Sequence, residues 1–245
     1  MKLKDFQELI NRTIFCAGGG LTEALRPNRK MPEVYIEKSG GNLIMAATNN
    51  RRLGYAIRSA GDDFLDFEGI LVPAAVLQKI AKRKRDTVPL SISVAGKEVN
   101  FHIGHACITT TALAGKFIQF FREPKEYPLR FPYSFTVDRL SLIEAIGFVS
   151  VMAEAWCPGL CLGLSPQVLT LRTGDDDSSA EDEISCDFTG ENAELVFHVK
   201  FFTEIIERIN TERVRIRFDT QKAVVVILPE PELDYYYFLA QRKRG

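Results

Sequence analysis

The chain nearly repeats itself, and this internal similarity constrains its fold more than any other feature. The segment Leu71–Ile103 matches the segment Leu195–Ile227 without gaps at a constant offset of 124 residues. Each copy has the pattern of a strand, then an amphipathic helix, then two strands of alternating apolar and polar residues. A looser match precedes each copy and pairs Leu3, Phe6, Leu9 and Phe15 with Val137, Leu140, Ile143 and Val149. The sequence therefore predicts two copies of one α+β domain.

Length and composition are typical of two globular domains. The 245 residues can bury a core in each half, and 46% of them are hydrophobic and 26% charged. The sequence contains no apolar run long enough to span a membrane, and the N-terminal segment Met1–Thr13 lacks the apolar stretch of a secretory signal. The five cysteines are scattered and odd in number, which favours buried free thiols in a reducing, cytoplasmic setting.

Three prolines between Pro124 and Pro132 disfavour helix and predict an extended connector. The predicted domains are residues 1–125 and 126–245. In the first domain we expect helices and strands at Lys4–Ile14, Glu33–Glu37, Leu43–Ala47, Ala74–Lys84, Leu90–Val94 and Val99–Ile103. In the second we expect helices at Asp138–Val149 and Val199–Asn210, a mobile acidic hairpin loop at Gly174–Glu183, and a last strand at Tyr235–Leu239.

The charges are segregated although the net charge is only −1. Basic residues crowd the end of the predicted helix Ala74–Lys84, whereas the corresponding helix Val199–Asn210 is mixed in sign. The basic helix has two interpretations, a solvated face or a surface for a polyanion. The repeat supports the second interpretation, because a ring of such domains would point equivalent helices at a common axis.

Four segments contain residue types found in catalytic or metal-binding sites, but each lacks a feature that catalysis or metal binding requires. The imidazoles of His102 and His105 diverge on a strand and have no ligand partner nearby. The spacing from Cys157 to Cys161 is not that of a CxxC motif, and Gly18–Gly20 is not followed by the Lys of a phosphate-binding loop. Asp175–Asp177 could bind Mg²⁺, but a loop of like charges such as this one is more often exposed to solvent without a metal. We therefore expect no catalytic residue, no metal and no cofactor.

Four further segments, in this order along the chain, carry a family resemblance. They are Ala47–Leu53 (ATNNRRL, preceded by Arg26-Pro27), Leu71–Leu77, Thr109–Phe117 and Leu195–Phe201. The first is similar to the ATDxxRL signature of the bacterial β sliding clamp, the processivity subunit of DNA polymerase III. The others resemble a helix start, a strand before the linker and a segment of the last domain of that family. The resemblance covers essentially the whole chain, as the middle and C-terminal domains.

The resemblance implies two tandem DNA-clamp domains, each with two helices packed on the concave side of curved antiparallel sheets. Six such domains form a closed ring whose helices contact the phosphates of double-stranded DNA without reading its bases. Two-domain protomers would need three copies for such a ring, joined head to tail. The residues expected to contact DNA are Lys79, Lys82, Arg83 and Arg85.

The resemblance also implies a groove between the two domains that binds short linear peptides of DNA polymerase and clamp-loader-type proteins. Carried over position by position, its residues are Met31, Thr48, Asn50, Arg51, Arg52 and Leu53 from the first domain, Pro124 from the linker, and Phe201, Tyr237, Leu239, Ala240 and Arg242 from the second. The chain departs from the family pattern at Asn49-Asn50, at His198 and in its last residues, and these departures affect the peptide preference.

Three functional hypotheses follow. The first is a non-catalytic, cytoplasmic sliding clamp that forms a homo-oligomeric ring on DNA and tethers a polymerase. The second is a clamp-derived adaptor that binds partner peptides without encircling DNA, which the near-zero net charge and the mixed-sign helix favour. The third is a nucleotide-processing enzyme, and no converging carboxylates or metal ligands support it.

Overall fold

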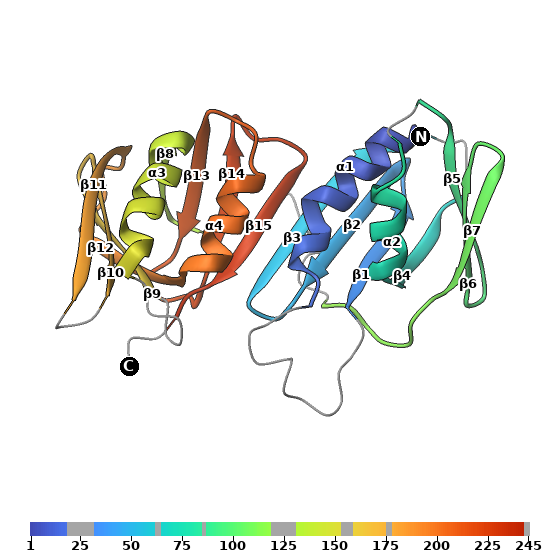
Figure 1. The fold of residues 1–245 in the computed structure, drawn as a ribbon, viewed down its shortest axis with the longest axis horizontal. Coiled ribbons are helices and arrows are strands. Elements are labelled where there is room, and N and C mark those ends of the chain that lie inside the picture. The colour runs from blue at the N-terminus through green and yellow to red at the C-terminus, as the bar shows by residue number, and fades with distance from the viewer. Residues whose placement is uncertain are drawn as a thin grey trace. The chain divides into compact units, whose positions relative to one another are not determined.

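The computed structural model describes residues 1–18, 32–61, 65–84, 87–118, 131–152, 159–174 and 178–242. The chain divides into two compact units, Met1–Gln119 and Phe120–Gly245. In each unit two helices lie side by side over one face of antiparallel strands (Figure 1), which confirms the predicted α+β class. The predicted connector Pro124–Pro132 falls largely outside the described residues, so the boundary at 125/126 stays a prediction.

The first unit has its strands in two antiparallel groups, ordered β3-β2-β1-β4 and β5-β6-β7. An isolated bridge between Leu71 and Leu113 links the two groups. The elements are α1 (Leu3–Thr13), η1 (Ile14–Cys16), β1 (Glu33–Ser39), β2 (Asn42–Thr48), β3 (Arg52–Ser59), β4 (Phe67–Pro73), α2 (Ala74–Ala81), β5 (Leu90–Ala95), β6 (Glu98–Ile103) and β7 (Ala106–Thr111).

The second unit has one continuous run of strands, ordered β12-β9-β10-β11-β8-β13-β14-β15. Strand β8 joins its two halves, because it pairs along its length with β13 and through Val137 with Cys186 at the end of β11. The elements are β8 (Tyr133–Asp138), α3 (Arg139–Val149), η5 (Ser150–Met152), β9 (Gly159–Ser165), β10 (Val168–Gly174), β11 (Ser179–Asp187), β12 (Ala193–His198), α4 (Val199–Arg208), β13 (Arg213–Phe218), β14 (Val224–Glu230) and β15 (Tyr235–Ala240).

Each unit repeats a module of one strand, one helix and three strands. The second unit contains β8-α3-β9-β10-β11 and then β12-α4-β13-β14-β15. The first unit contains the complete module β4-α2-β5-β6-β7, whereas the position of β8 is occupied by Lys2, in an isolated bridge to Pro89. The main chains of Met1 and Leu90 extend this contact by hydrogen bonding. The strand–helix–strand–strand pattern predicted for each repeat is confirmed.

The register predicted for the first helices was wrong by two residues. Helix α1 begins directly after Lys2 and α3 directly after Asp138, so the two align at an offset of 136 residues instead of 134. The sequence match had paired Phe6, which is 0% exposed, with Leu140, which is 59% exposed. The match failed because α3 has apolar residues on its solvent-facing side, and these produced a false alignment.

Helices α2 and α4 correspond at a different sequence offset from the strands around them. They begin at Ala74 and Val199, an offset of 125 residues, and Leu77 and Phe202 then occupy the same fully buried position. Strands β5 and β13 keep the offset of 124, since Leu90 and Val214 are equally buried. The gapless repeat is therefore correct for the strands and one residue out for the helices.

The acidic stretch predicted as a loop is mostly strand. Strand β11 begins at Ser179 and pairs with β10 as far as Gly174, so the loop prediction was wrong for 179–183. The exposed residues Glu181 and Glu183 alternate with half-buried ones. A strand with one solvated face accepts carboxylates at every second position. The loop prediction rested on the number of acidic residues in this stretch and overlooked their alternation.

The cores lie between the helices and the strands and are rich in phenylalanine. In the first unit the Phe6 ring packs 5.8 Å from that of Phe101, and in the second Phe197 stacks on Phe202 at 5.3 Å. All four side chains are fully buried. Burying each contributes about 1.5–3 kcal/mol to stability, so these contacts hold the helices on the strands.

The side chain before α3 caps that helix, whereas the one before α1 does not. Asp138 Oδ1 accepts hydrogen bonds from the main-chain N–H and the hydroxyl of Ser141, at 2.8 and 2.9 Å. These two bonds lower the pKa of the Asp138 carboxyl below its usual value. Lys2 has the same extended backbone but makes no side-chain cap.

A buried lysine ties the β1–β2 turn to the start of β4. Lys38, 3% exposed, places Nζ 2.8 Å from Oδ1 of Asp66, and the other carboxylate oxygen accepts the N–H of Gly40 at 3.1 Å. The hydrogen bond from Lys38, followed by that from Gly40, lowers the pKa of Asp66.

Candidate nucleic-acid interface

Helix α2 presents a basic end, formed by Lys79, Lys82, Arg83 and Lys84. All four side chains are exposed, whereas the buried residues of the helix lie on its opposite side. The helix stops at Ala81 instead of continuing to Lys84 as predicted, so three of the cations follow its last turn. The fourth residue of the predicted DNA-binding set, Arg85, lies outside the described residues.

A buried glutamine on α1 holds this basic end in place. Gln7 is 0% exposed, and its Nε2 donates to the carbonyl oxygens of Ile80 and Arg83, both at 3.0 Å, and of Ala81 at 3.4 Å. The last carbonyls of a helix have no intrahelical partner, so this amide caps α2 from a neighbouring helix. Gln7 was not among the predicted site residues, although a polar residue inside the apolar stripe of α1 is a visible signal.

The corresponding helix of the second unit carries acids where α2 carries lysines. At the offset of 125 residues, Lys79 falls on Glu204 and Lys82 on Glu207. Glu207 is exposed and Glu204 half-buried. Carboxylates at these two positions repel phosphates, whereas Arg83 falls on the exposed Arg208, so α4 keeps one of these three cations and replaces two.

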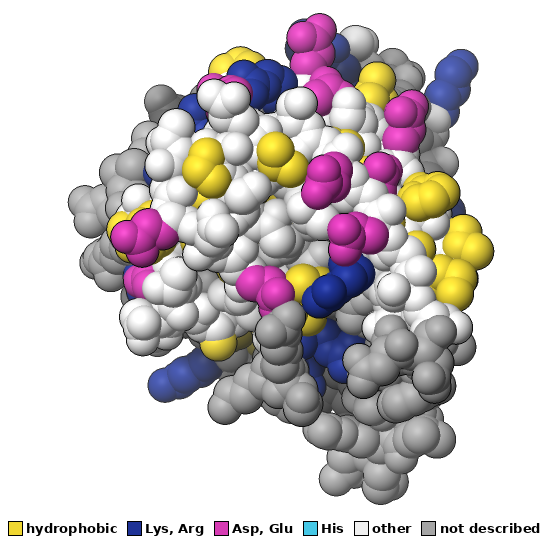
Figure 2. All heavy atoms as spheres, turned by 90° about the vertical axis from the view of Figure 1, so that its left-hand side faces the viewer, with side chains coloured by type: hydrophobic (Ala, Val, Ile, Leu, Met, Phe, Trp, Pro, Cys, Tyr) yellow, Lys and Arg dark blue, Asp and Glu magenta, His cyan; other side chains and the backbone are white. Residues whose placement is uncertain are grey.

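On the side of β11, the surface of the second unit also carries many acidic side chains. Figure 2, viewed from the side of β11, shows more Asp and Glu than Lys and Arg side chains. The exposed arginine Arg213 on β13 is neutralised by Asp187, and Arg217 pairs with Glu232 at 2.6 Å. These pairs leave that strand poorly suited to binding a polyanion.

The predicted groove residues of the first unit lie in the turn between β2 and β3. Thr48 Oγ1 donates to the carbonyl of Arg52 at 2.7 Å and accepts the N–H of Asn50 at 3.0 Å. Asn49 Oδ1 accepts the N–H groups of Arg51 and Arg52, both at 3.0 Å. Asn50 has a positive φ of 67°, which asparagine tolerates better than most residues. The turn therefore presents Asn50 and Arg51 to solvent in a defined shape.

Two residues of that set point into the first unit. Arg52 is 6% exposed, its Nη2 donates to the carbonyl of Phe15 at 2.6 Å, and its guanidinium lies 5.0 Å from the Phe15 ring centre. Leu53 is 2% exposed. Arg52 thus braces the segment after α1. Met31 lies outside the described residues.

The second-unit residues of the predicted groove gather near the start of α4 and the end of β15. Phe201 stacks on the His198 ring at 4.6 Å, and Tyr237 and Leu239 are 0% and 1% exposed on one face of β15. The main-chain N–H of Arg242 donates to Val196 of β12, the strand that leads into α4, at 2.8 Å. Ala240 ends β15, and Pro124 lies outside the described residues. The groove between the two domains stays a prediction.

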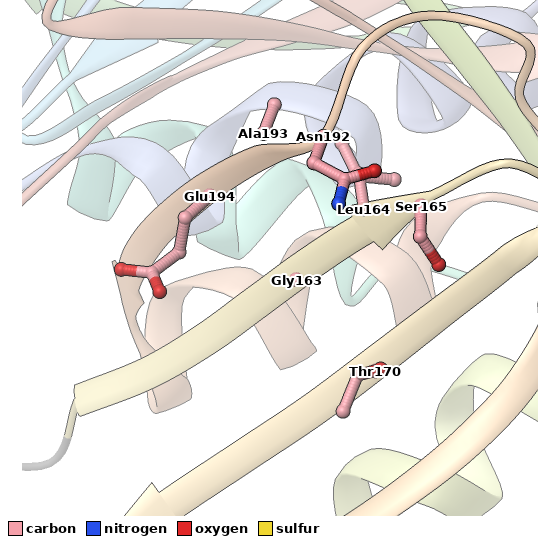
Figure 3. Close-up of a pocket in the computed structure, with 7 residues that line it drawn as sticks. All are labelled: Gly163, Leu164, Ser165, Thr170, Asn192, Ala193 and Glu194. Atoms are coloured by element: carbon pink, nitrogen blue, oxygen red, sulfur yellow. The ribbon is translucent and has the colours of Figure 1, made fainter.

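An open hollow of about 400 Å³ lies on β9, β10 and β12 (Figure 3). Gly163 is part of its lining, and a Cβ there would stand 3.6 Å from the Cβ of Thr170, an ordinary van der Waals contact. Its only ionisable lining residue is Glu194. The hollow therefore lacks the paired acid and base of an active site. Its lining residues are Gly163, Leu164, Ser165, Thr170, Asn192, Ala193 and Glu194.

The described residues offer no metal cluster. Among them, His, Cys, Asp and Glu side chains do not form a group of three or more that could hold an ion. Of the described cysteines, Cys16 and Cys186 are buried as predicted, whereas Cys107 is exposed. Burial, and then the charge of Asp187, raises the pKa of the Cys186 thiol. Within the described part of the chain, every helix is too short or too polar to cross a bilayer.

Sequence comparison with known proteins gives one family match and several similar proteins. Residues 127–241 match the family described as DNA polymerase III beta subunit, C-terminal domain. The β sliding clamp of Treponema pallidum is 21% identical over 240 residues, 96% of this chain and 62% of that protein. That of Synechococcus elongatus is 24% identical over 231 residues, 91% of this chain and 59% of that protein.

Solved structures agree with these sequence matches. The DNA polymerase III subunit beta of Pseudomonas aeruginosa superposes with a TM-score of 0.87 at 20% identity, over 100% of this chain and 65% of that one. A sliding clamp of the same organism bound to griselimycin gives a TM-score of 0.84 at 21% identity, over 100% of this chain and 64% of that one.

The fold is that of two tandem DNA-clamp domains, as the sequence predicted. The resemblance found in the sequence is also confirmed: the chain is similar to bacterial β sliding clamps over more than 90% of its length, and its second half matches the C-terminal domain of the DNA polymerase III beta subunit. It spans about 60% of the length of the curated relatives it matches.

Proposed function

We propose that this protein is a DNA sliding clamp, a non-catalytic processivity factor that encircles duplex DNA and acts in the cytoplasm. The observation that carries the proposal is the basic end of α2, which is exposed on the helix layer of a clamp-type domain. Lysine and arginine at such a surface attract phosphates without regard to sequence. Weak contacts of this kind permit sliding, while a closed ring prevents dissociation.

The assembly that fits the proposal is a closed head-to-tail ring of six clamp domains, of which this chain supplies two. Light scattering at micromolar concentration is expected to give the mass of a homo-oligomer. A strict monomer that does not remain on circular DNA would contradict the ring.

The DNA contact is tested by charge reversal on α2. We expect Lys79→Glu/Lys82→Glu to reduce retention on circular duplex DNA at least tenfold, and to lower the salt dependence of binding by about two units of slope for two lost phosphate contacts. The matched control is Lys97→Glu, which reverses an exposed charge in the β5–β6 turn. Equal retention by the wild type and the double variant would contradict the proposal.

We also propose that DNA polymerase and clamp-loader-type proteins bind this chain through short apolar peptides. The support is the β2–β3 turn, in which Asn49 Oδ1 accepts the N–H of the exposed Arg51. A fluorescent partner peptide should bind more weakly to Arg51→Ala than to the wild type, while Arg58→Ala, at the far end of β3, serves as the control. Unchanged affinity of Arg51→Ala would exclude this turn from the peptide site.

The second candidate is an adaptor that binds peptides without encircling DNA. It is favoured by the acids of α4 and by the solvent-facing side of α3, on which Leu140 and Phe148 are exposed. The adaptor predicts peptide binding with no salt-sensitive DNA binding. A loss of DNA retention in Lys79→Glu/Lys82→Glu would decide against it.

A further inference from the structure

Strand β5 lacks most of the neighbour that its counterpart β13 has. In the second unit β13 pairs along its whole length with β8. At the offset of 124 residues, β13 corresponds to residues 89–94 of the first unit. Among the described residues, the free side of this segment is met by Lys2, in an isolated bridge, and by Met1, which hydrogen bonds with Leu90. Beside residues 91–94 the described part of the chain places no strand.

The main-chain groups that would bind a further strand belong to Ile92 and Val94. Successive residues of an antiparallel strand direct their N–H and C=O groups to opposite sides. Leu90 directs both groups toward Met1, since its N–H donates to the Met1 carbonyl at 2.8 Å and its carbonyl accepts the Met1 amino group at 3.2 Å. Ile92 and Val94 therefore face the same side, away from β6. This edge offers two donors and two acceptors to an incoming main chain.

The far end of this edge is open to solvent. Ser93 is exposed and Val94 half-buried. Phe218, the counterpart of Val94, is 1% exposed beside β8. The side chain of Ile92 is already buried, at 3% exposure. An added strand would therefore contribute main-chain hydrogen bonds and cover Val94, whereas the core of the unit is complete without it.

Strand β8 shows which chemistry fits beside β5. The part of β8 that pairs with the counterparts of residues 91–94 is Tyr-Ser-Phe-Thr, residues 133–136. Within it Phe135 is 1% exposed and Ser134 is exposed. The matching occupant of β5 is an extended segment with an apolar residue opposite Ile92 and small polar residues on either side. Strand β8 itself already pairs with β11 and β13, so a second copy of this chain could supply it only by unfolding.

We propose that the edge of β5 binds an extended segment of a partner protein by strand addition. The segment runs antiparallel to β5, exchanges main-chain hydrogen bonds with Ile92 and Val94, and places an apolar side chain opposite Ile92. An unpaired sheet edge is a template for such pairing. The inference goes beyond the proposed clamp function and does not depend on it, because neither α2 nor the β2–β3 turn takes part.

The test uses a fluorescein-labelled peptide that ends in Tyr-Ser-Phe-Thr, with fluorescence anisotropy as the readout. Methylating the Phe amide nitrogen removes the donor that faces Ile92, whereas methylating the Ser nitrogen alters a group that faces away from β5. We expect the Phe-methylated peptide to bind about fivefold more weakly than the unmodified peptide, the effect of one lost hydrogen bond. The Ser-methylated peptide is the matched control and should bind like the unmodified one.

A variant of the protein tests the same contact from the other side. Val94→Pro removes a main-chain donor of the free edge, and proline is tolerated on an edge strand where the N–H group is unpaired. This variant should bind the unmodified peptide about fivefold more weakly than the wild type. The control is Ser93→Ala, which keeps every main-chain group and should bind like the wild type. If Val94→Pro fails to fold, the two methylated peptides decide the question with the wild type alone.

Three results would overturn the proposal. The first is the absence of saturable binding of the unmodified peptide by the wild type. The second is equal binding of the two methylated peptides, because the contact would then not be made through the main chain facing Ile92. The third is a wild-type oligomer that Val94→Pro converts to monomers, since the occupant of the edge would then be a second copy of this chain.

Discussion

The two units share one architecture and differ in what their helices show to solvent. In the first unit α2 ends in Lys79, Lys82 and Arg83, while in the second α4 has Glu204 and Glu207 at the first two of these positions. Buried residues such as Leu77 and Phe202 match between the units. The difference teaches that the core specifies the clamp-type domain, whereas the exposed helix faces specify what each domain contacts.

The units also differ in how their strands are joined. Strand β8 connects β11 to β13 in the second unit. In the first unit the equivalent place holds Lys2, bridged to Pro89, and the strands form two groups. Contacts between the helices therefore matter more in the first unit, and Gln7 is the clearest of them.

The largest expected effect comes from removing that contact. Gln7→Leu would remove the side-chain donor from the carbonyls of Ile80, Ala81 and Arg83, which costs about 1–3 kcal/mol in the free energy of unfolding. Urea denaturation measures the loss, and Asn11→Ala, a half-buried position on the same helix, is the control. A change below about 0.5 kcal/mol, within the range of ordinary surface substitutions, would show that the cap contributes little.

The next effect tests the charge difference between the units directly. Lys82→Glu is expected to weaken DNA binding about tenfold and to lower the salt slope by about one, since one phosphate contact is lost. Glu207→Lys should strengthen binding, because it gives α4 the charge of α2. Titrations of duplex DNA at several salt concentrations measure both. If neither variant changes binding, the helix faces do not contact DNA.

The cap before α3 should contribute about 1 kcal/mol, so Asp138→Ala is expected to destabilise the protein by that amount at pH 7. The folded-state pKa of Asp138 is lowered by Ser141, so the contribution is complete above the ordinary aspartate pKa of about 4. It is lost as the pH falls through the lower, folded-state value. Denaturation of both proteins across pH 2–7 should show the gap closing on acidification. A gap of constant size would contradict this account, and Asp234→Ala, at an exposed aspartate, is the control.

The smallest effect is a gain in the first unit. Lys2 precedes α1 with φ −83° and ψ 146°, close to the backbone of Asp138, but makes no cap. Lys2→Ser should supply an acceptor for the first turn and stabilise the protein by about 0.5–1 kcal/mol. Lys2→Ala lacks the acceptor and should give no gain in a thermal melt. Equal melting temperatures for the two variants would refute the capping difference between the units.

Much of the fold was predictable because buried residues repeat at helical and strand periods. The helices at Ala74 and Val199 and the strands around Leu90 and Val214 were found where the structure has them. The register of α1 against α3 was not, because Leu140 looks like a core residue and is exposed. Strand β11 was missed because a run of acidic residues hid its alternation.

The candidate site was predictable only as a set of residue types. The basic end of α2 follows from the spacing of its lysines, and the structure leaves those side chains exposed. The resemblance placed Arg51 and Arg52 in the groove together, but Arg51 lies in the β2–β3 turn and Arg52 is the first residue of β3. Arg51 is exposed and Arg52 is bound to Phe15.

The amino-acid sequence by itself determined that the chain is a duplicated α+β protein similar to sliding clamps, because local periodicity and the order of motifs can be read along the chain without knowledge of the fold. Tertiary structure decided which side chains act on their surroundings. Gln7 became a cap and α3 an apolar surface only when helices distant in the sequence were packed on shared strands. Burial and hydrogen-bond partners depend on such long-range neighbours, and the order of residues alone does not specify them.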